Sequence, residues 1–576
     1  LTFDSGFTTD PALSPDGKLI VFASDRGGTG SLDLWIQALE ADPKPRRLTL
    51  HPADDKEPAF SPDGNTIAFR SDRDGGGVYL ISVEGKDERL LVKDGRRPLY
   101  SPDGIWIAYW IGEIRGANQG SVFVAPASGG SPRRLGSELA GAQQAIWDSK
   151  SAHVLFLGYQ AEDPNRLFQT GSFDWWIAPI SGEQASRSHA EEILWEKRIN
   201  IASCEPAIWG LGDDKRAFFF TCPQGGSQNL WCLDVDPVTL QATGSPRQVT
   251  QGTTQLVNPW IARDGRIVFS SQSTNIDIWS LPLRSNEGKT TGDLSNLTQN
   301  DAFNTSPAVS EDGKKLVFRS NKLGTGLLWL KDLETGMEER LRAAGAGANF
   351  GQIRQSQGGY LVAFDARPGI GVLDTETGTV RRFGEEFLCP EAWSPDGKKI
   401  LCVGEPEISQ VDVATGKRTL LLTHPTFQHW EPRYAPDGRW IAFTAVPKEA
   451  RTDKHIYVAA LNGDTAAQEK EWIRVTAGET GNDKPRWSPD GNLLYFLSER
   501  DGFRCLYAQR LDPVTRRPVE GGLLEVQHFH SARLSPLYVN LANLKMSVAV
   551  DRIVLNLAEQ KGNIWIGKLE HGRPLD

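Results

Sequence analysis

Short apolar stretches with a period of two recur along the whole chain, and each follows a compact turn. Leu19–Phe22, Ile67–Phe69 and Ile441–Phe443 are typical of them. A polar loop and a second apolar stretch come next, as at Leu34–Ile36 or Ile456–Val458. Side chains of a β-strand alternate between two faces, whereas apolar positions of a helix recur at every third or fourth residue. The pattern therefore predicts many short strands joined by turns.

The turns share one four-residue motif. Ser-Pro-Asp-Gly stands at 14–17, 61–64, 101–104, 394–397 and 488–491, and close variants stand at 262–265, 310–313 and 435–438. Proline presets the second position of a type I turn, aspartate is tolerated at the third, and glycine takes the left-handed backbone that follows. Serine is expected to cap the turn through its hydroxyl. Each unit should therefore run strand, turn, strand, loop, strand, loop, strand.

Twelve such units, eight clear and four degenerate, can be counted over the 576 residues, which gives 48 residues per unit. A four-stranded propeller blade takes about 40–45 residues. A propeller typically holds about 4–8 blades, so twelve units favour two rings. The sequence predicts an all-β fold of two tandem six-bladed β-propellers, at 1–290 and 291–576. A split into five and seven blades fits the count equally well.

Closure of both rings can be argued from short Leu-Thr strands. Leu1-Thr2 reads as a fourth strand with no blade before it, and the last unit stops after its third strand, near Leu569. If Leu1-Thr2 completes the sixth blade and Leu297-Thr298 the twelfth, no strand edge is left unpaired. The polar stretch 284–296 would then be the crossover.

Charge and hydropathy exclude some classes of function. The 63 Lys and Arg residues against 73 Asp and Glu residues give a net charge of -10, and no basic block is long enough to follow a phosphate backbone. Nucleic-acid binding by this segment is therefore not expected. The chain has no apolar stretch of about 18 residues or more, so we expect no transmembrane segment in it. We expect a targeting or membrane-anchoring element to lie upstream of Leu1.

The Ser-Pro-Asp-Gly units, with their Ser-Asp-Arg loops at 24–26 and 71–73, resemble the TolB-type propeller repeats of bacteria. The opening run 1–26 and the tail 551–565 are similar to a narrower group, in which such propellers follow a Ser/Thr kinase or a winged-helix domain in membrane-anchored regulators. The resemblance implies a periplasmic or cell-surface location and a sensory or scaffolding role that binds a protein, a peptide or a small ligand. It also leaves open an envelope-assembly protein similar to TolB, which docks a lipoprotein.

Catalysis is not expected from the sequence. No Gly-x-Ser-x-Gly motif is present, and no α/β segment for a hydrolase is left once the blades are counted. His528 and His530 are the one close histidine pair, and their spacing places both side chains on one face of a strand, where they could bind Zn or Mn. A surface pair near a strand end is the more ordinary interpretation. We expect no cofactor, and a metal-dependent lyase or hydrolase is the alternative function.

The cysteines contain two candidate disulfide pairs. Cys389 and Cys402 flank the turn at 394–397 symmetrically, and Cys204 and Cys222 flank a turn at 210–215 in nearly the same way. Residues equally far from a hairpin turn face each other across the two strands. A bulge would shift this register by one residue and leave buried thiols instead. Disulfides would agree with an oxidising compartment.

A ligand is expected at the mouth of a propeller channel. The first strand of each blade lines the centre, so the residue before the proline of that strand should stand at the channel mouth. In the first ring these residues are Asp10, Glu57, Arg97, Glu205 and Asn258, with Asp54 and Asp55 nearby. Such a mouth is mostly acidic and suits a cationic or amine-bearing partner. In the second ring they are Ser306, Glu431 and Lys484, with Trp430 as an aromatic anchor.

Overall fold

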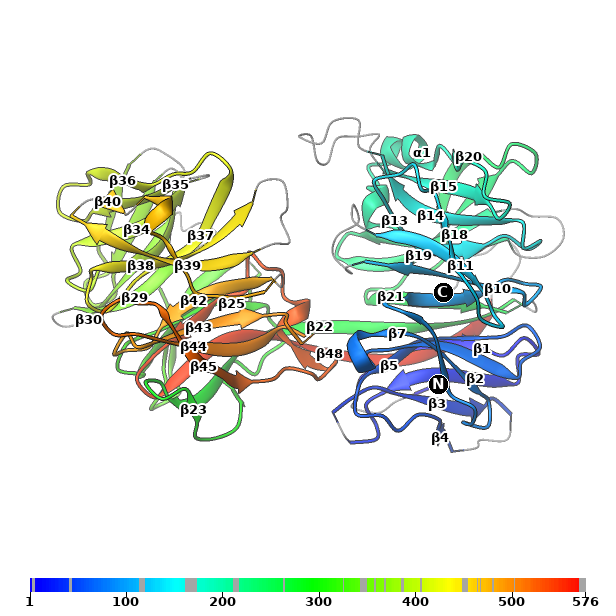
Figure 1. Cartoon of the computed structure of the whole chain (residues 1–576), viewed down its shortest axis with the longest axis horizontal. Coiled ribbons are helices and arrows are strands. Elements are labelled where there is room, and N and C mark those ends of the chain that lie inside the picture. Colours follow the sequence, from blue (N-terminus) through cyan, green and yellow to red (C-terminus); the bar gives the residue numbers. More distant parts are fainter. Residues whose placement is uncertain are drawn as a thin grey trace. The chain divides into compact units, whose positions relative to one another are not determined.

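A computed structural model of the chain shows an all-β propeller fold built from antiparallel sheets (Figure 1). The structure describes residues 1–568 except 3–5, 29, 41–43, 113–119, 161–172, 211–216, 263–264, 325, 342–349, 357–358, 367–368, 385–387, 405–406, 448–453, 464, 467, 479–480 and 502. Two compact units are present. Unit 1 comprises Leu1–Thr274, Ser531–Arg533 and Gln560–Asp576, and unit 2 comprises Asn275–His530 and Leu534–Glu559.

Within unit 1, consecutive antiparallel strands form four-stranded sheets in chain order. They are β1 (Thr8–Leu13), β2 (Leu19–Ser24), β3 (Asp33–Ala38) and β4 (Arg46–Arg47); β5 (Asp55–Phe60), β6 (Thr66–Ser71), β7 (Gly77–Ser82) and β8 (Arg89–Lys93); β9 (Arg96–Tyr100), β10 (Trp106–Ile111), β11 (Ser121–Pro126) and β12 (Arg133–Leu135); β13 (Gly141–Trp147), β14 (His153–Tyr159), β15 (Phe173–Pro179) and β16 (Ser186–Arg187); and β17 (Glu205–Trp209), β18 (Ala217–Gln224), β19 (Ser227–Val235) and β20 (Ala242–Gln248). The α-helix α1 (Ala190–Glu196) and the short 3-10 turns η1 (Arg73–Gly75) and η2 (Ile201–Ser203) lie between strands.

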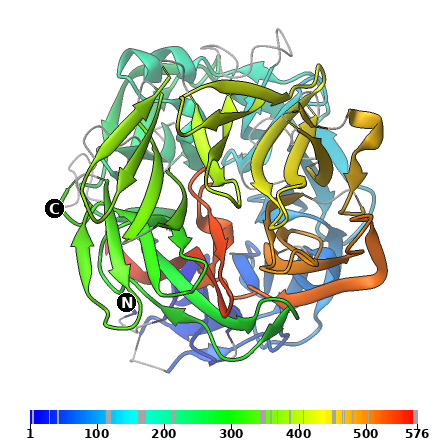
Figure 2. The same ribbon diagram turned by 90° about the vertical axis from the view of Figure 1, so that its left-hand side faces the viewer.

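Unit 2 follows the same plan, and Figure 2 shows its sheets arranged around a common centre. They are β25 (Asn304–Val309), β26 (Lys315–Ser320), β27 (Leu327–Asp332) and β28 (Glu338–Arg340); β29 (Phe350–Ser356), β30 (Gly359–Asp365), β31 (Ile370–Asp374) and β32 (Val380–Phe383); β33 (Cys389–Trp393), β34 (Lys399–Gly404), β35 (Glu407–Asp412) and β36 (Arg418–Leu422); β37 (Phe427–Tyr434), β38 (Trp440–Pro447), β39 (His455–Asn462), β40 (Thr465–Ala466) and β41 (Ile473–Arg474); and β42 (Asn482–Trp487), β43 (Leu493–Ser498), β44 (Cys505–Leu511) and β45 (Pro518–Gln527).

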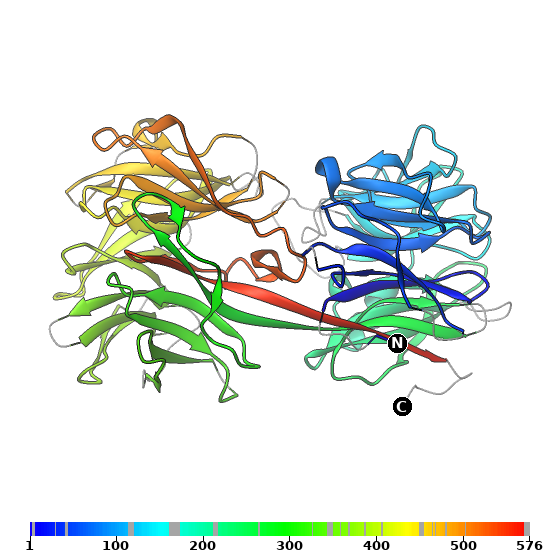
Figure 3. The ribbon, with the colours of Figure 1, turned by 90° about the horizontal axis from the view of Figure 1, so that it is seen from below.

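The remaining strands are shared or short. They are β21 (Gln255–Ile261), β22 (Arg266–Arg284), β23 (Lys289–Thr290), β24 (Ser295–Asn296), β46 (Leu534–Ser535), β47 (Met546–Val548) and β48 (Arg552–Lys568), with the 3-10 turns η3 (Glu469–Glu471) and η4 (Pro536–Tyr538). In Figure 3, β22 and β48 run side by side, and the two are hydrogen-bonded neighbours. Each of them contributes one half to unit 1 and the other half to unit 2.

The turn chemistry explains the hairpins. In the first repeat the Ser14 hydroxyl donates to the carboxylate of Asp16 at 2.6 Å and accepts the backbone N–H of Leu19 at 2.8 Å. Gly17 has φ of +68°, a left-handed backbone that glycine adopts without steric cost. The apolar side chains that follow the turn fill the space between neighbouring sheets; Val21 and Phe69, for example, belong to one buried cluster. The local motif therefore sets both the reversal and the buried face.

The last sheet of unit 1 is completed by the two ends of the chain. Strand β21 pairs with the first half of β22, and the second half of β48 supplies the third strand. The amino group of Leu1 donates to the carbonyl of Ile564 at 2.8 Å, and the Ile564 N–H donates to the Thr2 hydroxyl at 2.8 Å. Leu1-Thr2 therefore lies beside β48, at the position of a fourth strand in unit 1.

The last sheet of unit 2 contains the other halves of the two shared strands, which are the first half of β48 and the second half of β22. Strand β47 pairs with the first half of β48, and the second half of β22 follows as the third strand. Asn296 of β24 pairs with Trp279, and the N–H of Leu297 donates to the carbonyl of Ile278 at 2.8 Å. Leu297 therefore follows the fourth strand of this sheet.

This exchange differs from the sequence-based expectation that each unit runs through its four strands one after another. Strand β22 continues without reversal because residues 271–277 hold neither glycine nor proline to turn the chain. The second half of β22 then leaves unit 1, and the second half of β48 takes its position there. We retain six blades per unit as an interpretation, with one blade for each sheet.

The two candidate cysteine pairs differ in whether their residues lie opposite each other across the hairpin. Cys204 and Cys222 form a disulfide, since Glu205 pairs with Thr221 and the two cysteines lie opposite each other. Cys389 and Cys402 are not joined. A bulge in β33 pairs Cys389 with Val403 and places Pro390 opposite Cys402. The extra residue of the bulge shifts the register by one and separates the expected second pair.

Within the described ranges, the structure contains no helix with the length and apolar character that a membrane crossing needs.

Candidate functional site

A set of β-bulges turns polar side chains toward the centre of unit 1. In each bulge the extra residue of the first strand takes a left-handed backbone, and a bulge redirects the side chain that it carries. The φ angles are 52° for Asp10, 56° for Glu57, 46° for Arg97, 60° for Gln144 and 50° for Asn258. A non-glycine residue in this region costs about 1–2 kcal/mol. The surrounding sheets hold these five residues in place against that cost.

The first strands of unit 1 enclose a cavity of about 250 Å³. Six polar side chains of its lining form a ring, which we call the polar ring: Asp10, Glu57, Arg97, Gln144, Glu205 and Asn258. Apolar walls adjoin the ring and consist of prolines and the aromatic residues Tyr100, Trp147, Trp209 and Trp260. The Trp147 indole N–H donates to the Leu99 carbonyl at 2.9 Å and fixes that wall.

Hydrogen bonds and an ion pair link five members of the polar ring, all except Gln144, from sheet to sheet. The Asp10 carboxylate accepts the N–H of Glu57 at 3.1 Å, and the Glu57 carboxylate accepts the N–H of Arg97 at 2.6 Å. The Arg97 guanidinium reaches Asn258 at 3.1 Å and Glu205 at 3.0 Å. The Asn258 amide donates back to Asp10. The ring is therefore a rigid, preorganised set of donors and acceptors.

The polar ring carries more negative than positive charge. Three carboxylates, of Asp10, Glu57 and Glu205, face one guanidinium, that of Arg97. Burial, together with the charge of Glu57, raises the pKa of Asp10. Burial acts to lower the pKa of Arg97, but the neighbouring carboxylates of Glu205, Glu57 and Asp10 outweigh it and raise that pKa. A further cation in the cavity would therefore be attracted.

The structure brings together most of the residues expected at this mouth. Asp10, Glu57, Arg97, Glu205 and Asn258 all line the cavity, and Gln144 joins them. The sequence pattern missed Gln144 because Ala145, not proline, follows it; its position four residues before Asp148, as Asp10 stands four residues before Ser14, is the signal that could have found it. The bulge of β17 lies after Pro206, so Glu205 enters the ring without a left-handed backbone.

Asp54 and Asp55 do not line the cavity, which differs from the expectation. Asp55 binds the Arg73 guanidinium through both oxygens, at 3.0 and 3.1 Å, and so anchors the Ser-Asp-Arg loop. Asp54 accepts the N–H of Leu32 at 2.8 Å. Both carboxylates are buried, and Asp54, which directly precedes β5, joins that sheet to the segment before β3 of the neighbouring sheet.

The titration of Asp54 gives a testable stability change. Burial raises the pKa of Asp54 to about 6. A carboxyl whose pKa is raised in the folded state contributes stability below its unfolded pKa and loses it as pH rises through the folded value. We therefore expect Asp54→Asn, which keeps the acceptor for Leu32, to raise the free energy of unfolding by about 2–3 kcal/mol at pH 8 and by almost nothing at pH 4. Urea denaturation of both proteins at the two pH values measures the difference.

Asp72 is the matched control of opposite sign. Burial alone would raise the pKa of Asp72, but the charges of Lys56 and Arg70 lower it to about 2. Asp72→Asn should therefore destabilise the protein at pH 8. An Asp54→Asn protein whose stability tracks the wild type at both pH values would contradict the expectation.

The corresponding residues of unit 2 are buried in an ion network rather than exposed at a mouth. Glu431 and Lys484 have left-handed backbones and are only 3 % and 4 % exposed. The Glu431 carboxylate lies 2.9 Å from Lys484, 2.8 Å from Arg486 and 3.1 Å from Arg433. The other expected members differ in exposure: Ser306 is buried and Trp430 is half-buried. The described ion network therefore fills the space between the first strands β33, β37 and β42.

His528 and His530 lie after the end of β45, which agrees with the interpretation as a pair near a strand end and differs from the alternative that places both side chains on one face of a strand. Both belong to unit 2, whereas the polar ring belongs to unit 1.

Comparison with known proteins adds a family. The sequence family described as TolB beta propeller domain matches residues 1–110 and 373–553, which is half of the chain. This chain belongs to the TolB β-propeller family. The match includes both units and the Ser-Pro-Asp-Gly hairpins of each.

Curated relatives of this TolB-family chain match shorter stretches. The uncharacterized protein Atu1656 of Agrobacterium fabrum is 32% identical over 111 residues, which is 18% of this chain and 34% of that protein. The uncharacterized peptidase YuxL of Bacillus subtilis is 34% identical over 77 residues, which is 12% of this chain and 10% of the peptidase. The TolB-family chain thus spans about a third of the first relative and a tenth of the second.

Solved structures give weaker likenesses. A putative TolB from Agrobacterium tumefaciens shares 20% identity and a TM-score of 0.35, over 50% of this chain and 99% of that one. TolB from Acinetobacter baumannii shares 14% identity and a TM-score of 0.33, over 64% and 84%. The tricorn protease shares 17% identity and a TM-score of 0.33, over 88% and 50%. At these scores the likenesses carry no functional argument for the TolB-family chain.

Proposed function

We propose that this chain is a non-catalytic binding module, and that the cavity of unit 1 takes a basic side chain or an amine of a protein or peptide. The observation that carries the proposal is the polar ring, in which three carboxylates face one guanidinium inside apolar walls. A cavity of about 250 Å³ has room for one side chain or one chain end rather than for a folded partner.

The lining supplies both parts of such recognition. The aromatic walls Trp147, Trp209 and Trp260 offer apolar surface to the methylene groups of a long basic side chain, and the ring offers charge to its end. Because the ring is already linked by hydrogen bonds, it needs little ordering when a ligand binds. A small amine-bearing ligand would satisfy the same groups.

The biological setting that we propose follows from the family. An extracytoplasmic location, and a sensory or scaffolding role in a bacterial regulator, agree with the TolB-type repeats and with the Cys204–Cys222 disulfide, since disulfides persist in oxidising compartments. Docking of a protein in envelope assembly uses the same cavity chemistry and is compatible with the family. An upstream kinase, winged-helix domain or membrane anchor belongs to this proposal.

The test uses two fluorescein-labelled, acetylated pentapeptides, one with two lysines and one with two glutamates in the same places. We expect the full chain to bind the lysine peptide more tightly. Replacing Glu57 and Glu205 together by glutamine keeps their hydrogen-bond acceptors for Arg97 and removes two charges. This should weaken binding of the lysine peptide about tenfold or more, or about 1.4 kcal/mol. Fluorescence polarisation measures both affinities.

The control replaces Glu40 and Glu183, two exposed glutamates of unit 1 outside the cavity, by glutamine. This control makes the same change in net charge and should leave the affinity unchanged. Equal binding of the two peptides, or an equal effect of the cavity and the control variants, would reject the proposal.

A further inference from the structure

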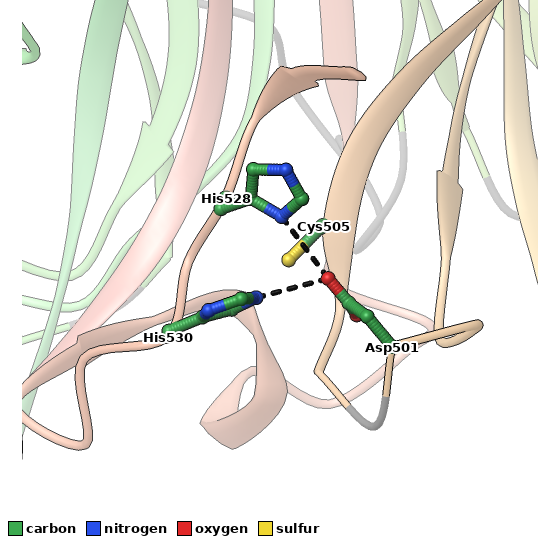
Figure 4. A group of neighbouring side chains, drawn as sticks. All are labelled: Asp501, Cys505, His528 and His530. Carbon is green, nitrogen blue, oxygen red and sulfur yellow. Dashed lines mark hydrogen bonds and ion pairs between the residues drawn. The ribbon is translucent and has the colours of Figure 1, made fainter. Parts of the chain in front are cut away.

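Four side chains of the kinds that bind metal ions meet at one end of the sheet β42–β45. Asp501 follows β43, Cys505 begins β44, and His528 and His530 follow β45. One ligand atom of each residue lies within 4.8 Å of those of the others. In Figure 4 both imidazole rings turn toward the Asp501 carboxylate, with the Cys505 sulfur beside it.

The distances suit a small cation at the centre of the group. His528 Nδ1 and His530 Nε2 lie 3.0 and 2.9 Å from the same oxygen of Asp501. Zinc bonds of about 2.0–2.3 Å to oxygen, nitrogen and sulfur in a tetrahedron place neighbouring ligand atoms about 3.3–3.8 Å apart. The two nitrogen–oxygen distances are shorter than this value, and all four ligand atoms lie within 4.8 Å of one another, so small side-chain rotations would bring them to the corners of a tetrahedron.

We propose that Asp501, Cys505, His528 and His530 together bind one Zn²⁺ ion in unit 2. One thiolate, two imidazoles and one carboxylate make a borderline-soft set, which favours zinc over magnesium, calcium or manganese. As the sulfur–zinc bond forms, the Cys505 thiol gives its proton to the solvent. Four protein ligands fill the tetrahedron, so the ion ties the segment of His528 and His530 to strand β44.

Groups around the four ligands already orient them. The second nitrogen of His528 lies 3.3 Å from the Glu525 carboxylate, the arrangement that fixes the tautomer of metal-binding histidines. The N–H of Phe529 donates to the Cys505 sulfur at 3.2 Å, and the Tyr507 hydroxyl donates to Asp501 at 3.1 Å. The Phe503 ring packs on His530 with ring centres 4.4 Å apart.

The exposure of these side chains also suits the entry of a metal ion from solvent. Cys505 is fully buried, whereas the side chains of His528 and His530 are 40 % and 48 % exposed. An ion can therefore enter from solvent while the thiolate stays protected. The site goes beyond the peptide-binding cavity of unit 1, because its residues all belong to unit 2.

The experiment uses the full chain, stripped with EDTA and titrated with ZnCl₂ against a chromogenic chelator. We expect one equivalent of zinc to bind. Cobalt(II) in its place should give a thiolate charge-transfer band and the strong visible bands of tetrahedral cobalt. His528→Gln and His530→Gln should each lower the zinc affinity at least about 100-fold, beyond the 10–100-fold typical of outer-shell partners. Cys505→Ala should remove the charge-transfer band.

His424→Gln and Cys402→Ala are the controls, a histidine and a cysteine of unit 2 outside the group, and both should bind zinc as the wild type does. The two exposed histidines can be replaced with little effect on folding, so their variants separate ligand loss from misfolding. Failure of the wild type to take up zinc at micromolar concentration would overturn the proposal. So would uptake that His528→Gln and His530→Gln leave unchanged, which would identify adventitious binding.

Discussion

Replacement of Glu431 by glutamine is expected to lower the free energy of unfolding of unit 2 by about 3–5 kcal/mol, because it leaves buried cations without their main counter-charge. The two Glu431 oxygens bind four cations: Lys484 and Lys545 through one oxygen, Arg433 and Arg486 through the other. Glu391 shares Arg433 and Lys545 at 2.8 and 3.1 Å but reaches neither of the other two.

The pKa of Glu431 supports the expected loss of stability. Burial acts to raise the pKa of Glu431, but the charges of Lys484, Lys545, Arg486 and Arg433 lower it well below its usual value. A carboxyl with a lowered pKa contributes stability above its unfolded pKa, and the contribution is lost as pH falls. The difference between wild type and Glu431→Gln should therefore be full at pH 7 and shrink below about pH 4.

Calorimetry of the full chain measures the effect, and Glu334→Gln is the matched control. Glu334 lies 3.1 Å from Lys314, but both side chains are more than half exposed, at 65 % and 55 %. An exposed ion pair contributes at most about 1 kcal/mol, so this variant should melt as the wild type does. If the Glu431→Gln protein melts within a degree or so of Glu334→Gln, the buried ion network contributes much less to the stability of unit 2 than proposed.

Removal of residues 560–576 is expected to destabilise unit 1 and to leave unit 2 intact. The deletion takes the second half of β48 out of the last sheet of unit 1 and leaves Leu1-Thr2 without its partner. Ile564 is fully buried, and its burial is worth about 1.5–3 kcal/mol. The hydrogen bonds lost with it contribute about 1 kcal/mol each. We expect a total loss of about 5 kcal/mol or more in unit 1.

A shorter deletion, of residues 569–576, is the control because it keeps β48 (Arg552–Lys568) whole. Calorimetry should show a shifted transition for the long deletion alone, and limited proteolysis should then cut first within 1–274. Unit 2 keeps the first half of β48, paired with β47, and should resist. Equal behaviour of the two deletion proteins would show that the shared strand contributes little to unit 1.

The hairpins and much of the cavity could be predicted because both depend on short-range sterics. Proline restricts the backbone wherever it occurs. It stands in the Ser-Pro-Asp-Gly turns and directly after Asp10, Glu57, Arg97 and Asn258, and the structure has the turn and the bulge at those positions. Gln144 has the same backbone without the proline, so the pattern could not show it. The cysteine pairs show the same limit, since one bulge residue separates Cys389 from Cys402.

Residues close to one another in the sequence determine three features of this protein. They are the repeats of strand and turn, the faces that become buried and the acidic character of the first cavity. Two features depend on partners hundreds of residues away. The exchange of β22 and β48 arises because residues 271–277 contain nothing that reverses the chain, so each strand pairs wherever an open sheet edge remains. The meeting of Asp501 and Cys505 with the histidine pair arises because β43 and β45 end, and β44 begins, at the same end of a folded sheet. No local pattern records which edges will meet, since that is settled by the packing of the complete units.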